Sequence, residues 1–402
     1  MSRSDGNPVR EQKVIIIGAG IGGLSTAAAL RRVGIAAEVW EQAPELRAAG
    51  TGLTVGCNAV TALRLLDIDL GFDTTRGAFV RKAQVLTPRG RVLAELPIME
   101  LAERLGAPSV CIHRGDMQAA LLEAAGDTPV HLGSVATGFD YDDHGVRVSF
   151  ADGREAHGSA LVGADGIRSV VRSQLHGEHP TRYGGFVCWL ATTPLSHPRV
   201  TPGWNAQYWG RGQRFGMHDI GQGRVYWWGT KNMPEHEART WNGSKEEIAR
   251  AFAGWAPETA RAIEITPRES IVAVPSQDRP FVDRWGAGPV TLLGDAAHCM
   301  LTSLAQGGSS AVEDAVVLAK TLQFAADPVS GLRAYEDLRR ERTRKLVEVS
   351  YELHRLEQQE KPLRLLARTI GLRFVGKHKM MEIFEDAMTM PPLPEKPAVT
   401  AH

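Results

Sequence analysis

One segment of the sequence combines an acidic residue, glycines and the start of a helix, which are features suited to holding a ligand. An apolar run over 290–293 is followed by Gly294 and Asp295, and a Gln-Gly-Gly run over 306–308 precedes a helical pattern from Ala311. The pattern predicts a buried strand, a turn and a helix start. A carboxylate at a strand end can hold a polyol hydroxyl. The unpaired N–H groups and partial positive charge of a helix start attract an electron-rich group.

A glycine-rich turn near the N-terminus has the spacing of a phosphate-binding loop. A β-branched run over 13–17 leads into Gly18, Gly20 and Gly23, and a small-residue helix and a second strand follow. In such a unit the glycines permit a tight turn, close approach of the backbone to a pyrophosphate, and close packing of helix on strand. Glu41 ends the second strand, where an acid accepts hydrogen bonds from ribose hydroxyls. The unit predicts a dinucleotide site; the alternative is a glycine turn with a purely structural role.

A second Asp-Gly turn follows the apolar run 160–164. Asp165 and Gly166 lead from this run into another helix start. Structural alternatives exist for each charged candidate: a salt-linked turn between Asp165 and Arg168, and a plain helix N-cap for Asp295. The arrangement of acids directly after apolar strands favours ligand binding over these alternatives.

A flavin coenzyme carries both chemical groups that the segment around Asp295 is suited to hold. Its ribityl chain supplies polyol hydroxyls, and the N1–C2=O edge of its ring becomes negative on reduction, where a helix start stabilises it. The glycine turn supplies a site for the pyrophosphate and a ribose. Together these segments predict non-covalently bound FAD.

The elements that must position these residues alternate between strand and helix at both ends of the chain, which predicts an α/β fold with a Rossmann-like FAD-binding domain. Between about 183 and 276, clustered aromatics and strand-like runs predict a mainly antiparallel β-sheet substrate domain with one helical segment, Lys245 to Ala253. Charged helical patterns over 331–359 and a helix from Pro362 to Met388 follow. The predicted division is an FAD-binding domain over 11–180 and 277–345, an inserted domain over 181–276, C-terminal helices over 346–390, and a disordered tail over 391–402.

Composition limits the classes of partner. The 402 residues include 46 basic and 46 acidic side chains, so no basic excess favours nucleic acid or stable membrane association. Four scattered cysteines without a CxxC pair suggest neither a zinc site nor a disulfide framework, and no metal is expected. The polar N-terminus lacks an apolar signal core, so we expect a cytoplasmic protein.

The three turns, in this order and flanking an aromatic-rich insert, resemble those of the single-component (group A) FAD-dependent aromatic monooxygenases of the p-hydroxybenzoate and salicylate hydroxylase type. The resemblance extends from Val14 to about Arg344. It implies transient NADH or NADPH as reductant, O2 as co-substrate, and hydroxylation of an aromatic or heteroaromatic small molecule through a flavin C4a-hydroperoxide. A single Rossmann fingerprint fits a nicotinamide that visits the flavin without a domain of its own.

The resemblance also implies roles for individual residues. Those that match cofactor-binding positions are Gly18, Gly20, Gly22, Gly23, Glu41, Arg47, Arg114, Asp165, Asp295, Gln306, Gly307 and Gly308. Arg114 matches an arginine near the FAD pyrophosphate, with a surface charge as its alternative role. The strand containing Trp209, Arg214 and Phe215 resembles the one that faces substrate. The candidate pocket residues are Trp189, Trp209, Phe215, Trp228 and Leu304, and each tryptophan has a core position as its alternative.

Two residues are candidates for catalysis. Thr302 stands where the family usually has proline, beside the reactive edge of the flavin, and its hydroxyl can hydrogen-bond substrate or peroxide. His218 is a candidate base for a phenolic substrate, with a hydrogen bond inside the sheet as the alternative. His298 is expected to brace the turn after Asp295.

Other functions are compatible with the same residues. One alternative is a flavin-dependent epoxidase or a dehydrogenase/reductase acting on a larger apolar substrate. A second is a flavin-binding redox sensor without turnover. We expect a monomer or homodimer, because the C-terminal helix carries apolar residues that pack on a second subunit or on its own core: Leu363, Leu365, Leu366, Ile370 and Leu372.

Overall fold

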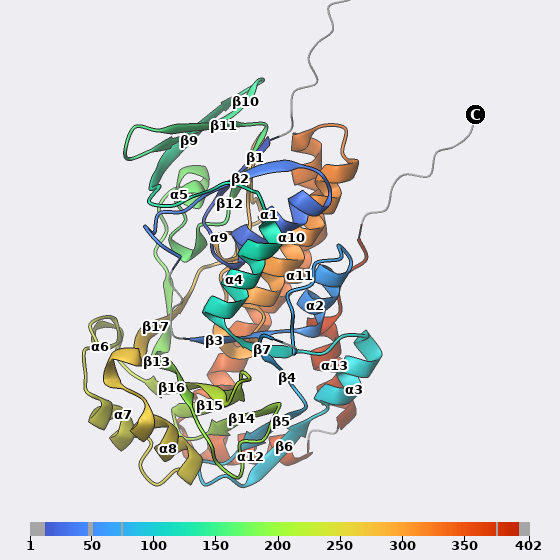
Figure 1. The fold of residues 1–402 in the computed structure, drawn as a ribbon. Helices are drawn as coiled ribbons and strands as arrows, with labels where there is room; N and C mark the ends of the chain where they lie inside the picture. Colours follow the sequence, from blue (N-terminus) through green and yellow to red (C-terminus); the bar gives the residue numbers. More distant parts are fainter. Residues whose placement is uncertain (1–12, 47–50, 74, 375–376, 394–402) are drawn as a thin grey trace, which may run out of the picture.

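The computed structural model describes residues 13–46, 51–73, 75–374 and 377–393. A five-stranded parallel sheet in the order β18-β12-β1-β2-β8 forms the centre of one half of the molecule (Figure 1). Its strands are short and mostly apolar because other elements cover both faces of the sheet. They are β1 (Lys13–Ile17), β2 (Ala36–Trp40), β8 (Val130–His131), β12 (Ala160–Gly163) and β18 (Val290–Leu292). The predicted α/β fold is confirmed.

Long helices pack against this sheet and against one another. They are α1 (Ile21–Arg32), α4 (Arg114–Ala125), α10 (Gly307–Phe324) and α11 (Pro328–Glu357). Helix α10 begins at Gly307, within the predicted helix start, although the helical pattern of the sequence is clear only from Ala311. Glycine and serine are weak helix formers, but Ser309 and Ser310 are buried, and Ser309 Oγ accepts a hydrogen bond from Gly56 N at 2.9 Å. Tertiary contacts therefore override local propensity at this helix start.

Two small sheets and several short helices connect the main layers. One sheet has the order β11-β10-β9 and the other β3-β7-β4. The strands are β3 (Gly52–Val55), β4 (Ala78–Phe79), β7 (Val110–His113), β9 (Ala136–Asp142), β10 (Gly145–Phe150) and β11 (Glu155–Gly158). The helices are α2 (Cys57–Arg64), α3 (Ile98–Leu105), α5 (Val170–His176), α9 (Asp295–His298) and the 3-10 turns η1 (Gly166–Arg168), η2 (Arg268–Ser270) and η3 (Thr302–Leu304).

A seven-stranded sheet in the order β17-β13-β16-β15-β14-β5-β6 forms the other half. Five strands come from the aromatic-rich stretch: β13 (Arg182–Pro194), β14 (Trp204–Trp209), β15 (Gln213–Asp219), β16 (Arg224–Asn232) and β17 (Val272–Asp278). The other two, β5 (Lys82–Leu86) and β6 (Val92–Leu96), come from far upstream, and β5 pairs in parallel with β14. The predicted substrate domain, residues 181–276, does not include this upstream hairpin.

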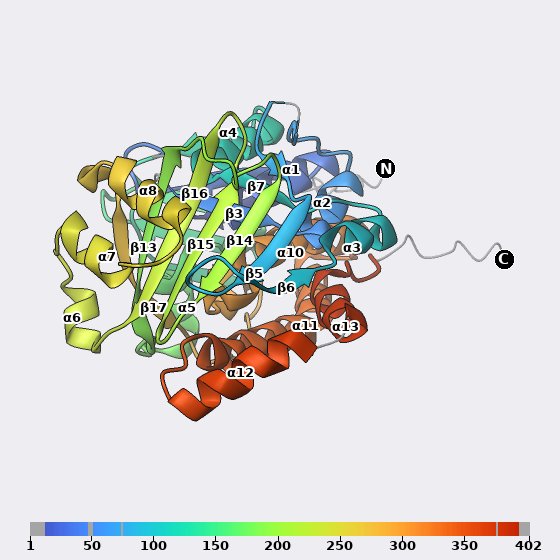
Figure 2. The same ribbon diagram turned by 90° about the horizontal axis from the view of Figure 1, so that it is seen from below.

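Three helices cover one face of the seven-stranded sheet. They are α6 (Glu235–Arg239), α7 (Lys245–Ala251) and α8 (Pro257–Ile265), seen beside the sheet in Figure 2. The expectation of a single helical segment between 183 and 276 is therefore wrong. Helix α8 was missed although Pro257 at its first position and Glu258 in its first turn are helix-start signals.

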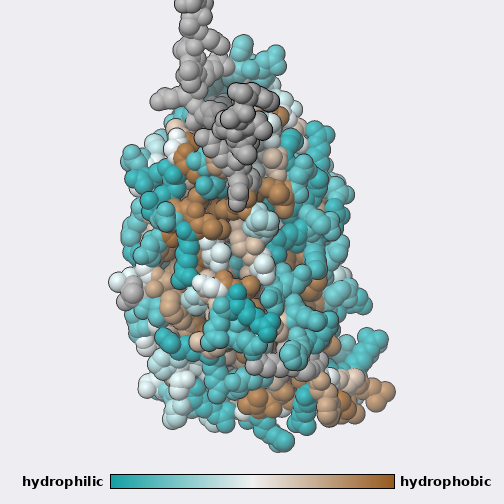
Figure 3. Space-filling model, turned by 90° about the vertical axis from the view of Figure 1, so that its right-hand side faces the viewer, coloured by the Kyte–Doolittle hydropathy of each residue, from teal (hydrophilic) through white to brown (hydrophobic). Residues whose placement is uncertain are grey.

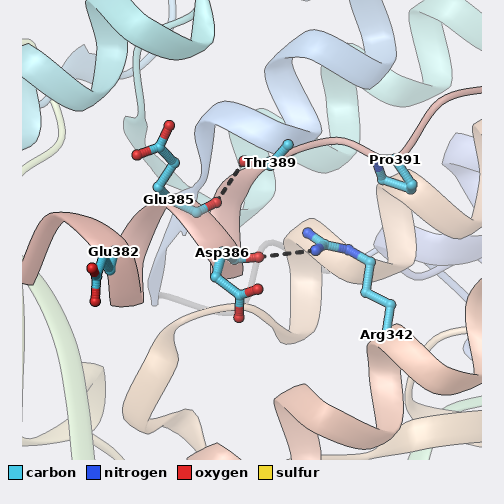
Figure 4. Close-up of a pocket in the computed structure, with 6 residues that line it drawn as sticks. All are labelled: Arg342, Glu382, Glu385, Asp386, Thr389 and Pro391. Carbon is cyan, nitrogen blue, oxygen red and sulfur yellow. Dashed lines mark hydrogen bonds between the residues drawn. The ribbon is translucent and has the colours of Figure 1, made fainter. Parts of the chain in front are cut away.

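The C-terminal helices lie on the other side of the molecule. The single helix predicted from Pro362 to Met388 is two helices, α12 (Pro362–Phe374) and α13 (Lys377–Met388). Arg342 of α11 donates to the carbonyl oxygens of Asp386 (3.1 Å) and Ala387 (3.0 Å), which joins α13 to α11 beside a surface depression (Figure 4). Among the described residues, no helix has the length and apolar composition to cross a bilayer. From residue 394 on, the predicted tail lies outside the described residues.

Candidate flavin and substrate site

The predicted ligand-binding turns meet at one edge of the parallel sheet. Strands β1, β2, β12 and β18 are neighbours and run in the same direction. The turns after their carboxyl ends carry Gly18, Glu41, Asp165 and Gly294-Asp295. In open α/β sheets, ligands bind outside the carboxyl ends of the strands. The topology therefore brings together segments that are separated by more than a hundred residues in the chain.

The glycines of the first turn have different surroundings. A Cβ added to Gly18, where φ is +103°, would lie 2.5 Å from Ala164 O, and one added to Gly23 would lie 1.8 Å from Gly18 O. A Cβ added to Gly22 would lie 2.8 Å from Cδ2 of Leu293. These three glycines allow close packing. Gly20, by contrast, has no atom within 4 Å of an added Cβ, and it precedes α1 without a side-chain cap. Open space at an uncapped helix start suits a pyrophosphate.

Glu41 lies beside this turn at the end of β2. Its carboxylate accepts hydrogen bonds from Ala19 N at 2.7 Å and Ala43 N at 2.8 Å. These bonds fix the side chain next to the glycine turn, and each carboxylate oxygen retains a further lone pair for a ribose hydroxyl. Arg47, the other predicted cofactor ligand nearby, lies outside the described residues.

Asp165 caps the start of α5. Its Oδ2 accepts from Val170 N (2.8 Å) and Val171 N (3.3 Å), while Oδ1 is buried and has no hydrogen-bond partner among the described residues. Burial raises the pKa of this carboxyl group, and the hydrogen bonds oppose that shift. No ion pair with Arg168 is present among the described residues, so the geometry is that of a capping aspartate with one free oxygen rather than a salt-linked turn.

Asp295 begins the short helix α9 and makes no side-chain capping bond. Its side chain is exposed, yet desolvation by the protein packed around it raises its pKa, which the charges of His298 and Arg114 partly offset. A Cβ added to Gly307 would lie 3.8 Å from Asp295 Oδ1. Asp295 is thus an open carboxylate in a recess beside the start of α10, and it is not a helix N-cap.

The start of α10 is free to bind an electron-rich group. Gln306 precedes it without a side-chain capping bond, and the first turn contains no acidic residue. Gln306 itself is buried, and its Oε1 accepts from Asn58 Nδ2 at 2.9 Å. Gly307 and Gly308 follow and are half-buried, with Leu53 of β3 3.5 Å from a Cβ added to Gly308. The N–H groups of this turn are therefore presented between β3 and Asp295.

A buried network holds this turn in place. His298 Nε2 lies 2.6 Å from Asp314 Oδ2, which also accepts from Gly294 N at 3.1 Å. Arg339 Nε donates to Asp314 Oδ1 at 2.6 Å. Burial alone would raise the pKa of Asp314, but the charges of His298 and Arg339 lower it to about 2. His298 has the bracing position that was expected of it.

Glu313 strengthens the link to α11 and extends this network to α2. Its carboxylate pairs with Arg339 at 2.5 Å and with Arg342 at 2.8 Å, and it accepts from Asn58 Nδ2 at 2.6 Å. Burial opposes ionisation, yet the two arginines keep the pKa of Glu313 below its usual value. Helix α10 is thereby fixed to α11 and to α2, so the N–H groups at its start have a defined direction.

The seven-stranded sheet presents different side chains on its two faces. Trp189 and Phe215 are fully buried on the face under α7 and α8, where Phe215 stacks on Trp227 with ring centroids 5.3 Å apart. Because side chains alternate along a strand, Arg214 and His218 of β15 lie on the opposite face. The placement of Trp189 and Phe215 separates them from that face, so we leave them out of the proposed pocket.

Trp228 and His218 lie together on this second face. Trp228 Nε1 donates to His218 Nε2 at 3.0 Å, and His218 Nδ1 lies 3.8 Å from Cys111 Sγ of β7. Burial lowers the pKa of His218 to about 4. At neutral pH the imidazole is therefore neutral and its acceptor nitrogen is occupied, which is the sheet hydrogen bond that was the alternative to a catalytic base.

A buried ion pair joins this face to the turn before α10. Arg214 Nη1 lies 2.6 Å from Glu357 Oε2 of α11, and Ser303 Oγ donates to the same oxygen at 2.6 Å. The guanidinium of Arg214 also lies over the ring of Trp228, 4.9 Å from its centroid. Burial raises the pKa of Glu357, and Arg214 and the Ser303 hydroxyl oppose this. The pair fixes Ser303, the middle residue of η3.

The other residues of η3 point to different surroundings. Thr302 is exposed, and its hydroxyl makes no hydrogen bond with a described residue. Leu304 is buried in an apolar cluster with Met300 and Cys111, against which the half-buried Tyr226 packs. Trp209 lies farther along the sheet, under Arg368 of α12 with 5.5 Å between guanidinium and ring centroid. Leu304 and Tyr226 are thus brought together, Trp228 is linked to η3 through Arg214, Glu357 and Ser303, and Trp209 belongs to the contact with α12.

Three residues near the site were not identified from the sequence. Tyr226 is on the same face of β16 as Trp228, a relation that strand alternation contains once the strand is placed. Burial raises the pKa of Tyr226 far above its ordinary value, while the charge of Arg114 partly offsets this. Cys111 and Glu357 come from β7 and α11, and only the pairing of distant segments brings them here.

The residues at the strand ends fit FAD. Four features together match the pyrophosphate, the ribityl hydroxyls and the flavin ring edge of FAD. They are the open space at Gly20, the free Oδ1 of Asp165, the open carboxylate of Asp295 and the uncapped start of α10. The fold and these sites define a flavin-binding oxidoreductase with a separate sheet facing the flavin region.

The family model for the FAD binding domain matches residues 11–350, and the chain belongs to this family. It is 37% identical over 372 residues to the aurachin C monooxygenase/isomerase of Stigmatella aurantiaca, which covers 91% of this chain and 95% of that protein. It is 33% identical over 338 residues to the FAD-dependent urate hydroxylase of Klebsiella pneumoniae, covering 83% of this chain and 88% of that protein.

A solved structure agrees with these matches. Klebsiella pneumoniae HpxO complexed with FAD and uric acid superposes with a TM-score of 0.88 and 28% sequence identity, covering 95% of this chain and 98% of that one. The chain is therefore an FAD-dependent monooxygenase, and the predicted resemblance to the aromatic hydroxylases is confirmed.

Proposed function

We propose that this monooxygenase takes electrons from NADH or NADPH and uses O2 to hydroxylate an aromatic or heteroaromatic small molecule. The observation that carries the proposal is the position of Tyr226 and Trp228 near η3. Tyr226 packs against the apolar cluster that contains Leu304. Trp228 lies under the guanidinium of Arg214, which pairs with Glu357, and Glu357 accepts the hydrogen bond of Ser303. This arrangement brings a flat, half-buried aromatic wall beside the start of α10. The Klebsiella relative is a urate hydroxylase, which supports a flat heteroaromatic substrate.

FAD, when bound, supplies the exchange of electrons between the nicotinamide and oxygen. The chain's part is to bind and orient it. Gly20 leaves room for the pyrophosphate, and Glu41 and Asp295 accept from sugar and ribityl hydroxyls. The N–H groups at the start of α10 favour negative charge on the ring edge, each such contact contributing about 0.3–2 kcal/mol.

Tyr226 and Trp228 are suited to orient a flat substrate. The raised pKa of Tyr226 keeps its hydroxyl protonated at neutral pH, so it is available as a hydrogen-bond donor to a substrate oxygen or ring nitrogen. Trp228 already uses its N–H toward His218, so it offers the face of its ring. Arg114, which lies close enough to influence both Tyr226 and Asp295, adds positive charge at this end of the site.

The substrate's own ring substituents must activate the reacting carbon. His218 does not serve as a base at neutral pH, because its pKa is about 4 and its Nε2 accepts from Trp228. A hydroxyl or amino group on the substrate ring, held by Tyr226, supplies the electron density that an electrophilic oxygen transfer needs. Leu304 and the apolar cluster around it exclude water from this region.

A substrate screen tests the proposal. Purified protein with bound FAD is mixed with NADH or NADPH and a panel of hydroxylated and aminated aromatics and heteroaromatics, and nicotinamide oxidation and product mass are followed together. We expect at least one compound to accelerate nicotinamide oxidation and to gain one oxygen atom. Retention of FAD with no accelerated oxidation and no oxygenated product across the panel would overturn the proposal.

A further inference from the structure

Helix α12 presents a continuous apolar stripe to solvent. Leu363, Leu366, Ile370 and Phe374 have exposed fractions of 83%, 58%, 47% and 81%. They are spaced i, i+3, i+7 and i+11, so they follow one face of the helix. Figure 3 shows the hydrophobic side chains gathered at the lower right of the molecule, where α12 lies. Scattered exposed leucines are ordinary on protein surfaces, but an aligned stripe is not.

The opposite face of α12 is firmly attached to the protein. Arg368 is buried and donates to Glu357 O at 2.9 Å and Gly210 O at 2.8 Å. Leu372 packs against the apolar cluster that contains Trp209. The direction of the exposed stripe is therefore fixed by contacts on the other face of the helix.

Positive charges flank the stripe. Residues 361–374 contain Lys361, Arg364, Arg368 and Arg373 and no Asp or Glu. Arg364 and Arg373 are exposed, make no ion pair with a described residue, and lie on opposite sides of the stripe at 3.6 residues per turn. An apolar face bordered by cations is the composition of helices that lie in a membrane interface.

Glu360, directly before Lys361, is the single exposed acid at the start of this segment, and the acids that follow α12 in the chain are paired with other residues. Glu382, Glu385 and Asp386 of α13 are paired, in order, with Lys379 at 2.8 Å, Arg104 at 3.3 Å and Lys345 at 2.7 Å. The zero net charge of the whole chain therefore conceals a locally basic, apolar surface on α12.

We infer that α12 docks the protein on an anionic lipid surface. The apolar stripe enters the boundary between headgroups and acyl chains, and Arg364 and Arg373 contact lipid phosphates. A second copy of the chain fits less well, since a two-fold contact through α12 brings like charges together. A stable dimer also buries about 800 Å² on each partner, more than four side chains of one helix supply. The inference is independent of the proposed substrate and revises the expectation of no stable membrane association.

Vesicle flotation of the FAD-loaded full chain tests this inference. We expect the protein to float with vesicles of equimolar phosphatidylcholine and phosphatidylglycerol, and not with phosphatidylcholine alone. The variant R364Q/R373Q should bind about 30-fold more weakly, because each basic residue near an anionic surface contributes about fivefold. The variant L366E/F374E should bind at least about tenfold more weakly, since both side chains lose their apolar burial. FAD absorbance verifies that each variant is folded.

A matched substitution and a measurement of mass complete the test. Leu65 is 50% exposed at the end of α2, and Leu65→Glu should leave vesicle binding unchanged. Absence of flotation with both vesicle types, or equal flotation of wild type and both α12 variants, overturns the inference. A wild-type dimer that L366E/F374E converts to monomer, without vesicle binding, also overturns it and assigns the stripe to a contact between copies.

Discussion

Two buried ionic groups flank the candidate site, and they differ in how well the fold compensates their charges. On the flavin side, Asp314 and Glu313 each have several cationic or hydrogen-bonding partners, and the pKa of each is lowered despite burial. On the substrate side, Glu357 has Arg214 and Ser303, and burial still raises its pKa. The flavin side is thus a rigid support whose buried charges stabilise the fold. On the substrate side, burial makes the ionised form of Glu357 unfavourable.

The largest effect is expected on the flavin side. Asp314→Asn leaves Arg339 and His298 without their shared anion, and breaking such a buried group costs about 3–5 kcal/mol. Urea unfolding should show this loss, and FAD should bind more weakly because the turn at Gly294 loses the charged acceptor that holds it. Asp337→Asn is the control: its side chain is 69% exposed on α11, so stability should change little. Equal stability of the two variants would contradict the proposed support.

His218 should make stability depend on pH. Its folded-state pKa of about 4 lies below its ordinary value of 6.5, so the stability it contributes is complete above 6.5 and is lost as pH falls toward 4. At pH 5 the loss amounts to about 2 kcal/mol. His218→Gln keeps an acceptor for Trp228 and should remove this part of the acid dependence.

Urea unfolding of wild type and His218→Gln at pH 7 and pH 5 measures this difference. His157, whose side chain is 67% exposed, provides the control His157→Gln, which should retain the wild-type pH dependence. If His218→Gln also retains it, His218 is not held neutral by burial.

Substitution of Glu357 should affect activity more than stability, whereas substitution of Asp314 should mainly reduce stability. Glu357→Gln leaves the buried Arg214 without its carboxylate partner, but because burial already disfavours the charged form of Glu357, the loss of stability should be smaller than that of Asp314→Asn. The substitution should nevertheless lower kcat/KM by about 10- to 100-fold, since Ser303 and η3 lose their fixed position beside the site. Comparing urea unfolding with steady-state kinetics separates these effects. A loss of stability as large as that of Asp314→Asn would remove the distinction between the two sides.

Thr302→Pro is the mildest predicted change. Leu301 already has φ −65° and ψ 154°, the extended conformation required before proline, and Thr302 N makes no hydrogen bond with a described residue. Stability should therefore stay the same or rise by about 0.4–1 kcal/mol. We expect FAD to remain bound and the ratio of product formed to nicotinamide consumed to change. An unchanged ratio would place Thr302 away from the chemistry.

The sequence predicts the flavin side well because its signals are local. Gly18, Asp165 and Asp295 each lie in the turn after an apolar strand, and parallel pairing of those strands then brings the turns to one edge. At the helix start at Gly307, buried contacts compensate a weak local propensity for helix.

The substrate side depends on pairings that local patterns do not contain. Trp189 and Trp228 are both strand tryptophans, and only the alternation and the helices packed on each face separate a core position from an open one. Glu357 lies in a charged helix that resembles any solvated helix until its pairing with Arg214 is known. The hairpin of β5 and β6 joins the sheet through a parallel contact with β14, far along the chain.

The central claim, oxygen transfer from O2 to an aromatic substrate at this flavin, is tested most directly by isotope labelling. A turnover mixture of FAD-loaded protein, NADH or NADPH and the best compound from the screen is run under ¹⁸O2, and the product is analysed by mass spectrometry. We expect a product that carries a single ¹⁸O atom. A product with oxygen only from water, or hydrogen peroxide as the sole fate of the labelled oxygen, would contradict this claim.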